Sequence, residues 1–409
     1  MKSLTPKIIL ILIFAIFTYF FTNNMGVVDI EKMAIITAIG IDIDQDEYSI
    51  TAQIAVPEED STSTEKRKTH LTGKGVTVGD AIKSISDVSG WYPQLIFCNL
   101  IVIGEDFEQI NVITVLDFFA KTLRIQDSAL VVMADGKAKD LLSNSSPLDN
   151  ISSFALQKIL HKKSGFNKDV AEVNVKDFCT GYYGRSASSF MPIVKTVKQE
   201  NSSDSSSSQQ SNNGGSNQIG GMSGTGASSS SGSQGSVLFD VKNTALFKNG
   251  IKVGELDEES TATLNLLSDN FSESTIPLKD VNCNLYNKCN YLITIIKNDK
   301  SLNLEVEDEE ITLKVKLNLF CKISDQNSTF SDTVLSKNTP LPPEVKDAII
   351  TKLNDNIHTL FQKIKQTDCD LLNLDKKLFK YHNKHYRNSS DNLLESMKVN
   401  VEVNVEGHN

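Results

Sequence analysis

The sequence predicts an α+β fold, in which mixed sheets pack with helices in an N-terminal and a C-terminal extracytoplasmic domain after one N-terminal transmembrane helix. Three observations lead to this prediction. Strand-like and helix-like stretches are interleaved over residues 29–197. Antiparallel strand patterns, a long amphipathic helix and an alternating strand occupy residues 237–409. Between them, residues 198–236 have a composition that cannot form a core.

The first 28 residues are predicted to be a membrane anchor or signal. Ile8–Phe21 is an apolar run of 14 residues, and no charge follows it until Asp29. This length suits a signal peptide, but a helix over Leu4–Val28 would measure about 37 Å at about 1.5 Å per residue and could cross a bilayer. Lys2 and Lys7 precede the run, which predicts export of the remainder. We favour an uncleaved anchor because no small-residue cleavage site follows; a cleaved signal and a buried core helix are the alternatives.

The N-terminal domain, residues 29–197, is expected to begin with a hairpin. Met33–Ile43 and Glu47–Val56 are β-rich and separated by three polar residues. Thr77 and Asp80 form a capping pair ahead of an apolar helical face. Further expected elements are a strand over Leu95–Ile103, a helix over Phe107–Leu123, a strand over Ala129–Met133, helices over Lys137–Leu142 and Ile151–Lys162, and a closing strand at Met191–Val194.

Residues 198–236 are predicted to be a disordered tether. Between Asn201 and Ser236, 15 of 36 residues are Ser, eight are Gly, and Asp204 carries the one charge. Such a segment buries too little apolar surface to offset the entropy of ordering it. It is either a linker between domains or an insertion at a loop tip, and both interpretations place a boundary here.

The C-terminal domain is predicted to cover residues 237–409, with a division into subdomains 237–275 and 276–409 as an alternative. Asn249-Gly250 lies between two β-rich runs, and this dipeptide is a strong hairpin signal. A short helix is expected over Asp257–Ser268.

Four antiparallel strands are expected next, at Thr275–Leu285, Tyr291–Asn298, Leu302–Val306 and Ile311–Ile323. Pro342 and Pro343 should then open a long helix that runs to about Lys365, because its apolar residues recur every three or four positions. Apolar and polar residues alternate over Met397–Glu406, which predicts a half-buried final strand.

Composition excludes some classes of function. The net charge is −10, from 51 acidic and 41 basic residues, and Lys66-Arg67-Lys68 is the densest basic stretch. Neither a nucleic-acid binder nor a broad polybasic membrane patch is therefore expected. The sequence contains no Gly-x-Ser-x-Gly, His-Glu-x-x-His or dinucleotide fingerprint. We predict a protein that is not an enzyme and needs no cofactor.

Three weak motifs are better explained without a ligand. Asp42-x-Asp44-x-Asp46 resembles a calcium loop, but Glu47 and Gln53 occupy its sixth and twelfth positions instead of Gly and Glu. Gly73-Lys74-Gly75 lacks the spacing of a phosphate loop. His382-x-x-His385 has no third ligand at usable spacing. We expect a polar turn, a strand and solvated histidines, and no metal site.

The six cysteines are too sparse for a disulfide scaffold, and they include no Cys-x-x-Cys. Cys283 and Cys289 could face each other across a tight turn and pair. The alternative is that all the thiols are buried and apolar.

The segment that follows the anchor, DIEKMAIITAIGID over Asp29–Asp42, resembles the start of the Ger(x)C family, the C subunits of nutrient germinant receptors of bacterial spores. Three further stretches are similar to the family in the same order: Thr69–Ile82, Ala245–Glu259, and Asp368–Tyr386 with the terminal VNVEVNVEG. The resemblance covers nearly the whole chain outside the tether.

The sequence departs from the family near its start. Family members usually carry a lipobox cysteine that is cut and acylated, followed by a Trp-Asp pair. With Ile30-Glu31-Lys32 as the register, Asn24 stands where that cysteine would be, and Met25-Gly26 replaces the pair. We expect no lipid at Asn24 and a peptide anchor instead. Asp370-Leu-Leu-Asn replaces the family's Asp-Ile-Phe-Gly-like segment.

The resemblance implies a non-catalytic, membrane-anchored receptor subunit needed for nutrient-triggered germination. It would lie on the outer face of the inner spore membrane with two multi-span partners, the A-type and B-type subunits, and would need no small-molecule ligand of its own. One alternative is a sporulation or envelope structural protein that reuses the fold without a receptor. Another is an envelope enzyme, which would need a nucleophile or paired carboxylates converging in a cleft.

Overall fold

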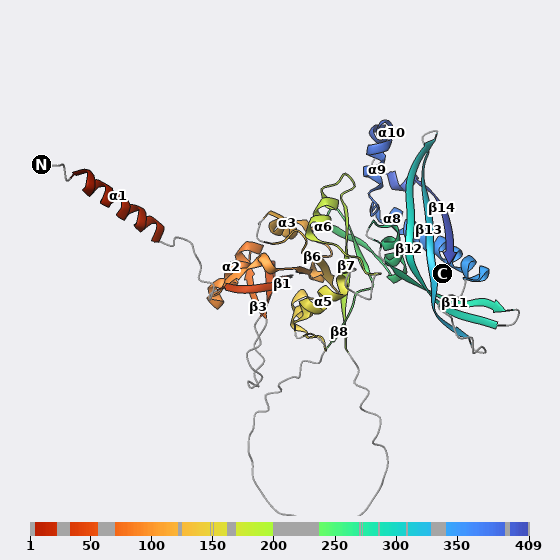
Figure 1. Ribbon diagram of the computed structural model, residues 1–409, viewed down its shortest axis with the longest axis horizontal. Helices are drawn as coiled ribbons and strands as arrows, with labels where there is room; N and C mark the ends of the chain where they lie inside the picture. The colour runs from red at the N-terminus through yellow and green to blue at the C-terminus, as the bar shows by residue number, and fades with distance from the viewer. Residues whose placement is uncertain are drawn as a thin grey trace, which may run out of the picture.

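The computed structural model (Figure 1) describes most of the chain outside the serine-rich segment. The described residues are 5–22, 33–55, 70–121, 125–147, 149, 151–161, 169–198, 237–269, 271, 273–284, 287–307, 310–328, 341–388 and 393–407.

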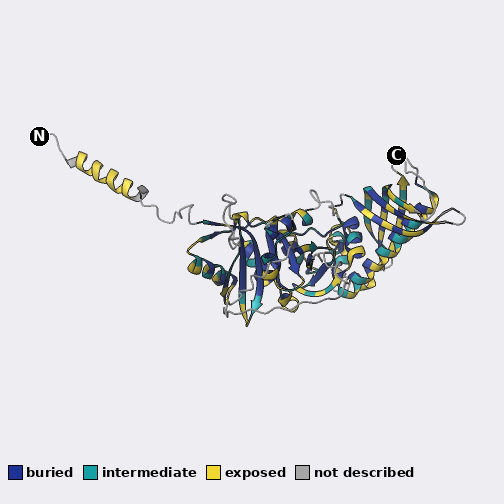
Figure 2. Ribbon diagram, turned by 90° about the horizontal axis from the view of Figure 1, so that it is seen from below, coloured by how far each residue is buried: buried dark blue, intermediate teal, exposed yellow. Residues whose placement is uncertain are grey.

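The first helix, α1 (Thr5–Thr22), stands apart from the body and presents apolar side chains to the outside. Every side chain described in it, from Lys7 to Tyr19, is exposed (Figure 2). The alternative of a buried core helix is therefore wrong. Across the residues that the structure describes, no helix combines the length and apolarity needed to cross a membrane, so the predicted transmembrane helix is not confirmed.

A mixed ten-stranded sheet forms the first body. Eight strands follow the order β10-β9-β7-β6-β5-β1-β2-β3, while β4 pairs with β1 and β8 pairs with β7. The strands are β1 (Met33–Asp44), β2 (Glu47–Ile54), β3 (His70–Gly75), β4 (Tyr92–Gln94), β5 (Leu100–Ile103), β6 (Leu130–Ala134), β7 (Ser188–Lys198), β8 (Val237–Asp240), β9 (Thr244–Lys248) and β10 (Ile251–Leu256). β1, β5, β6 and β7 are parallel neighbours, and the outer pairs are antiparallel.

Helices cover both faces of this sheet. On one face, Ile101 and Ile103 of β5 join a core with residues of α2 (Val78–Ser89), α3 (Ile113–Lys121) and α6 (Val175–Tyr182). On the other face, Leu100 and Val102 join a core with residues of α4 (Ala138–Ser143) and α5 (Ser152–Leu160). Successive residues of a strand point to opposite faces, so both must be apolar when both faces are covered.

The ten-stranded sheet includes chain from both sides of the serine-rich segment. β7 pairs antiparallel with β8, from Lys195 opposite Asp240 to Lys198 opposite Val237. β9 and β10 extend the sheet further, although the sequence assigned them to the C-terminal domain. Of the two interpretations given above, the topology favours an insertion between neighbouring strands. The predicted tether itself lies outside the described residues.

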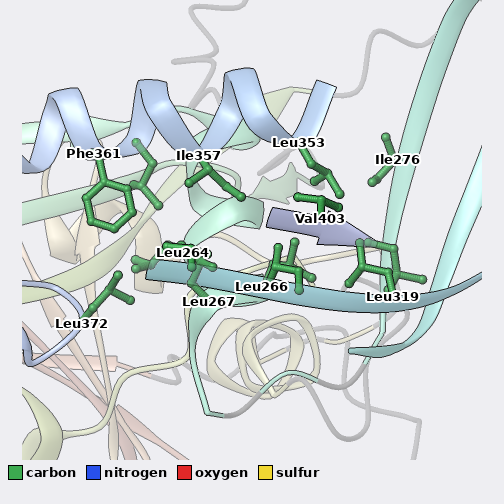
Figure 3. Close-up of a cluster of buried hydrophobic side chains, with 14 of the residues drawn as sticks. Leu264, Leu266, Leu267, Ile276, Leu319, Leu353, Ile357, Phe361, Leu372 and Val403 are labelled. Atoms are coloured by element: carbon green, nitrogen blue, oxygen red, sulfur yellow. The ribbon is translucent and has the colours of Figure 1, made fainter. Parts of the chain in front are cut away.

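A four-stranded sheet in the order β11-β12-β13-β14 forms the second body. Its strands are β11 (Ser274–Asn284), β12 (Asn287–Glu307), β13 (Glu310–Ser328) and β14 (Lys398–Gly407), and β14 runs parallel to β13. Its helices are α7 (Glu258–Leu267), α8 (Pro343–Thr367), α9 (Leu374–Tyr381), α10 (Asn383–Asn388) and α11 (Leu393–Ser396). Figure 3 shows the α8 side chains Leu353, Ile357 and Phe361 pointing toward a core that includes α7 leucines, Leu319 and Val403.

Local signals predicted several elements correctly. Gln45 and Asp46 have positive φ values in the β1–β2 turn, and Asn249 and Gly250 have them in the β9–β10 turn. Thr77 Oγ1 accepts the Asp80 N–H at 3.1 Å at the start of α2. The long helix α8 and the final strand β14 also form where expected.

Three predicted elements differ from the structure. Leu95–Ile103 is not one strand: Leu95–Phe97 is a 3₁₀ turn that exposes Ile96 and Phe97 in succession, which a strand with one covered face cannot do. The helix expected from Phe107 begins at Ile113. The two strands expected between residues 291 and 306 are one strand, β12, because its polar centre stays paired with β13, as in Asp299 opposite Asn318.

Candidate functional site: the junction between the two sheets

Residues from both bodies meet where α8 ends. At Asp368 the backbone turns into the left-handed region, with φ 49°, and the chain passes to α9. The turn lies against β7 and β9 of the ten-stranded sheet. We call this set the junction: Arg185, Ser188, Lys248, Asp368, Asp370, Asp375 and Tyr386.

Asp370 is a buried carboxylate, 6% exposed, that binds the start of α9. Its Oδ1 accepts the Leu374 N–H and its Oδ2 accepts the Asp375 N–H, both at 2.9 Å. Its own N–H donates to Ser188 Oγ of β7 at 3.0 Å. Asn373 makes no side-chain cap, so Asp370 supplies the acceptors that the first turn of α9 needs. Burial raises the pKa of the Asp370 carboxyl, although these backbone hydrogen bonds oppose the shift.

Lys248 of β9 holds the end of α8. Its Nζ lies 2.6 Å from the Asp368 carbonyl oxygen and 2.6 Å from Asp368 Oδ2. The Lys248 side chain is 23% exposed and the Asp368 side chain is 48% exposed, so the ion pair is partly open to solvent and the bond to the carbonyl oxygen is the better shielded contact. Next to it, the buried Cys369 thiol donates to the Phe247 carbonyl at 3.5 Å.

Arg185 joins the first body to α9 and α10. Its Cζ lies 4.1 Å from the centre of the Tyr386 ring, and its Nη1 donates to the Tyr386 carbonyl at 3.3 Å. The same nitrogen is 3.8 Å from Asp375 Oδ1. Burial raises the pKa of the Asp375 carboxyl, and Arg185 partly offsets this effect. A planar guanidinium can stack and pair in this way at once, whereas an ammonium cannot.

The junction has the chemistry of a structural joint. Its polar groups bind one another, and the adjacent Cys369 is not activated, since burial raises the pKa of this thiol to about 11. Within the described ranges, no group of three or more His, Cys, Asp or Glu residues is placed to hold a metal ion. The arrangement fixes the position of one sheet relative to the other.

The residues of the calcium-like motif do not converge on a common site. Asp42 is 2% exposed and accepts the N–H groups of Ala138 at 2.7 Å and Lys139 at 2.9 Å, at the start of α4. Burial raises the pKa of the Asp42 carboxyl. Asp44 pairs instead with Lys74 at 2.6 Å. The motif is a turn that also carries a buried helix cap.

The other candidate residues also have structural partners or lie outside the described part. A Cβ at Gly73 would lie 2.3 Å from the Ala81 carbonyl oxygen, so this glycine permits close packing of β3 on α2. His382 Nε2 lies 2.9 Å from the Leu304 carbonyl oxygen, so His382 is not the solvated residue that we expected. Asn24 lies outside the described residues.

Four cysteines, at positions 98, 179, 321 and 369, are free and buried. Cys289 is disulfide-bonded. The side chain of Cys283 lies outside the described ones, so the predicted Cys283–Cys289 pair stays a prediction. The pairing of β11 with β12 places Asn282 opposite Lys288, one residue from each cysteine.

Sequence reasoning missed most of the junction. The family-like stretch Asp368–Tyr386 contains the junction residues of the second body, but nothing in the sequence singles out Arg185, Ser188 or Lys248. Arg185 and Tyr386 are 201 positions apart, and no local pattern marks either residue.

The fold and the junction together define the class of this protein. It is an α+β protein of two bodies, one with a mixed ten-stranded sheet and one with a four-stranded sheet, and buried polar contacts join the two bodies. Two family models match it in order. A model described as the spore germination protein N-terminal domain matches residues 26–196, and one described as spore germination B3/GerAC-like, C-terminal, matches residues 242–408. The chain belongs to the Ger(x)C family of spore germination proteins.

A solved structure has the same fold. The crystal structure of the GerBC protein aligns with a TM-score of 0.52 at 15% identity, over 93% of this chain and 100% of the GerBC chain. At this identity the alignment is evidence for the fold alone. No curated protein matches the chain.

Proposed function

We propose that the chain is a non-catalytic, membrane-anchored subunit of a spore germinant receptor, needed for nutrient-triggered germination. It works on the outer face of the inner spore membrane, with the multi-span A-type and B-type subunits as partners. The observation that carries this proposal is the match of two family models, in order, to the two halves of the chain.

The N-terminal helix supports membrane attachment by peptide. Ile8, Leu10, Phe14 and Phe17 of α1 are each at least 54% exposed. Large apolar side chains on all sides of a helix need an apolar environment such as lipid. Since Asn24 stands at the lipobox position, this helix takes over the role that a diacylglycerol plays in the family.

The junction supports a scaffold role. A receptor subunit that docks against two partners must hold its own bodies in a fixed relation, or binding would have to order them first. The contacts of Arg185, Lys248 and Asp370 provide this fixed relation.

Co-purification tests the proposal. The full chain, with a C-terminal affinity tag, is isolated from detergent-solubilised spore membranes, and the bound proteins are identified by mass spectrometry. We expect two multi-span receptor subunits to be retained. A tagged chain recovered from the coat or the soluble fraction without them would refute the receptor assignment.

Intact mass tests the anchor. The membrane-bound chain should have the mass of the full, unacylated sequence. The variant Asn24→Cys is a matched comparison, since it restores a cysteine at the lipobox position. A shortened chain in the wild-type sample would mean signal cleavage and would contradict the peptide anchor.

A further inference from the structure

An exposed apolar surface lies at the end of the ten-stranded sheet where the chain enters from the anchor. We define the entry surface as Val88, Trp91, Ile96 and Phe97, whose exposed fractions range from 48% to 86%. These residues come from the end of α2, the link from α2 to β4 and the turn after β4. The parallel pairing of β4 with β1, Met33 opposite Tyr92 and Ile35 opposite Gln94, places them beside the start of β1.

Local structure holds these side chains outward. Gly90 ends α2 in the left-handed conformation, with φ 72°, and its N–H donates to the Ser86 carbonyl at 2.8 Å. Ser86 Oγ donates to the Trp91 carbonyl at 2.9 Å, and the Trp91 N–H donates to Ser89 Oγ at 3.2 Å. Two hydrogen bonds therefore fix the backbone that presents the indole.

The turn that carries Ile96 and Phe97 is fixed by its flanks. Leu95 is 5% exposed and Cys98 is fully buried, so both ends of the turn are embedded in the core of the sheet. Gln126 Nε2 also donates to the Ile96 carbonyl at 3.2 Å. Two large apolar side chains are held in solvent by a rigid support, which is costly unless something covers them.

We propose that the entry surface lies in the lipid headgroup region of the membrane that holds α1. This inference rests on the proposed membrane anchoring. Eleven peptide steps separate Thr22 from Met33, so the start of β1 lies within about 39 Å of the end of α1, taking about 3.5 Å per residue. Figure 1 shows α2 on the side of this body that faces away from the four-stranded sheet, next to the edge strand β3.

Composition identifies the occupant as lipid. Residues 86–97 contain one charge, Asp87, and no Lys or Arg, which suits contact with lipid that does not depend on anionic headgroups. Trp is enriched at the membrane interface, because its ring is apolar and its N–H stays hydrated. Trp91 is followed by Tyr92, which adds a second residue of this kind.

The chain contains a single tryptophan, so Trp91 is its own probe. The full chain is reconstituted into vesicles of phosphatidylcholine and phosphatidylglycerol, and fluorescence is measured with lipids brominated near the headgroup or near the acyl ends. We expect a blue shift relative to the detergent-bound chain, and stronger quenching by the shallow bromines. Quenching should stay unchanged when the phosphatidylglycerol fraction is varied.

A matched pair of variants localises the contact. Ile96→Ser with Phe97→Ser should reduce the quenching of Trp91 while the chain still floats with the vesicles. Ile251→Ser with Val253→Ser removes two apolar residues on β10, 38% and 42% exposed, and should leave quenching unchanged. Circular dichroism is the check that both variants fold like the wild-type chain.

Vesicle flotation separates failure of this inference from failure of the anchor. If the chain floats but Trp91 is not quenched, the proposed contact of the entry surface with lipid is wrong, while the proposed anchor stands. A chain that does not float overturns both. If Trp91 is shielded from acrylamide only when the receptor subunits are co-reconstituted, the proposed lipid contact is also wrong. The entry surface would then be a site of protein contact.

Discussion

The two sheets of this protein bury their strands in different ways. All residues of β5 and β6 in the ten-stranded sheet are buried, because helices cover both faces. In β13 of the four-stranded sheet, Leu313, Val315 and Leu317 are buried, while Lys314 and Lys316 between them are exposed. A continuous apolar strand indicates two covered faces, and an alternating strand indicates one.

The largest predicted effect tests this difference by substituting neighbouring residues. Leu100→Ala and Ile101→Ala remove side chains from opposite faces of β5, and each should cost about 2–5 kcal/mol in the free energy of unfolding. In β13, Leu317→Ala should cost as much, whereas the adjacent Lys316→Ala should change stability by less than about 0.5 kcal/mol. Urea unfolding followed by circular dichroism gives these values. A tolerated change at either β5 position would contradict the two-face description.

The next prediction compares the two buried aspartates, since each accepts two backbone N–H groups at a helix start. Asp42→Ala and Asp370→Ala should each cost about 1–3 kcal/mol, because buried donors lose their acceptors. Asp299→Ala, at an exposed pair with Lys297, is the control.

The two variants should differ in how far through the protein hydrogen exchange increases. Asp42→Ala should increase hydrogen exchange in the first body alone, whereas Asp370→Ala should increase it in β7 and in the four-stranded sheet together. If Asp370→Ala also increased hydrogen exchange in only one of the two bodies, the junction would not couple the sheets.

A smaller effect concerns pH. The pKa values of Asp42 and Asp370 are raised in the folded state by burial, so the folded chain binds these protons more tightly than the unfolded chain. Their stabilising contribution is complete below the unfolded pKa of about 3.9 and is lost as pH rises through the raised folded values. Asp370→Asn should remove part of this decline as pH rises above the unfolded pKa of about 3.9, measured by urea midpoints. An unchanged pH slope would show that Asp370 does not titrate there.

The disulfide state is tested by the number of free thiols. Alkylation in denaturant without reductant should label the four free cysteines, and all six should be labelled after reduction. Cys283→Ser should give five labels without reductant, because it releases Cys289. Six labels on the wild-type chain without reductant would refute the disulfide.

Elements with strong local signals were predictable. The Asn249-Gly250 turn, the apolar spacing of α8 and the alternation of β14 each depend on neighbouring residues alone. Composition predicts one strand over Leu95–Ile103, because apolar residues alone do not distinguish a buried strand from an exposed apolar turn. β12 was divided at its polar centre, since its pairing with a strand downstream cannot be inferred from that stretch.

The junction was not predictable for the same reason. Lys248 and Asp368 are separated by 120 positions, and neither lies in a pattern that requires the other. A lysine at the end of a strand is usually solvated, and only the packing of the bodies gives it a partner. Asp370 shares this property, because its N–H finds its acceptor on Ser188 of β7, 182 positions earlier.

The pairing of β7 with β8 has a practical consequence. Because Lys198 lies opposite Val237, the two points where the chain leaves and re-enters the sheet are neighbours. Closing a longer excursion between them costs only about 0.6 kcal/mol for each doubling of its length. A fluorescent protein whose own ends lie close together can therefore be encoded within residues 199–236 without altering the register of the sheet. Such a fusion leaves both termini native and lets the chain be followed by microscopy in living cells.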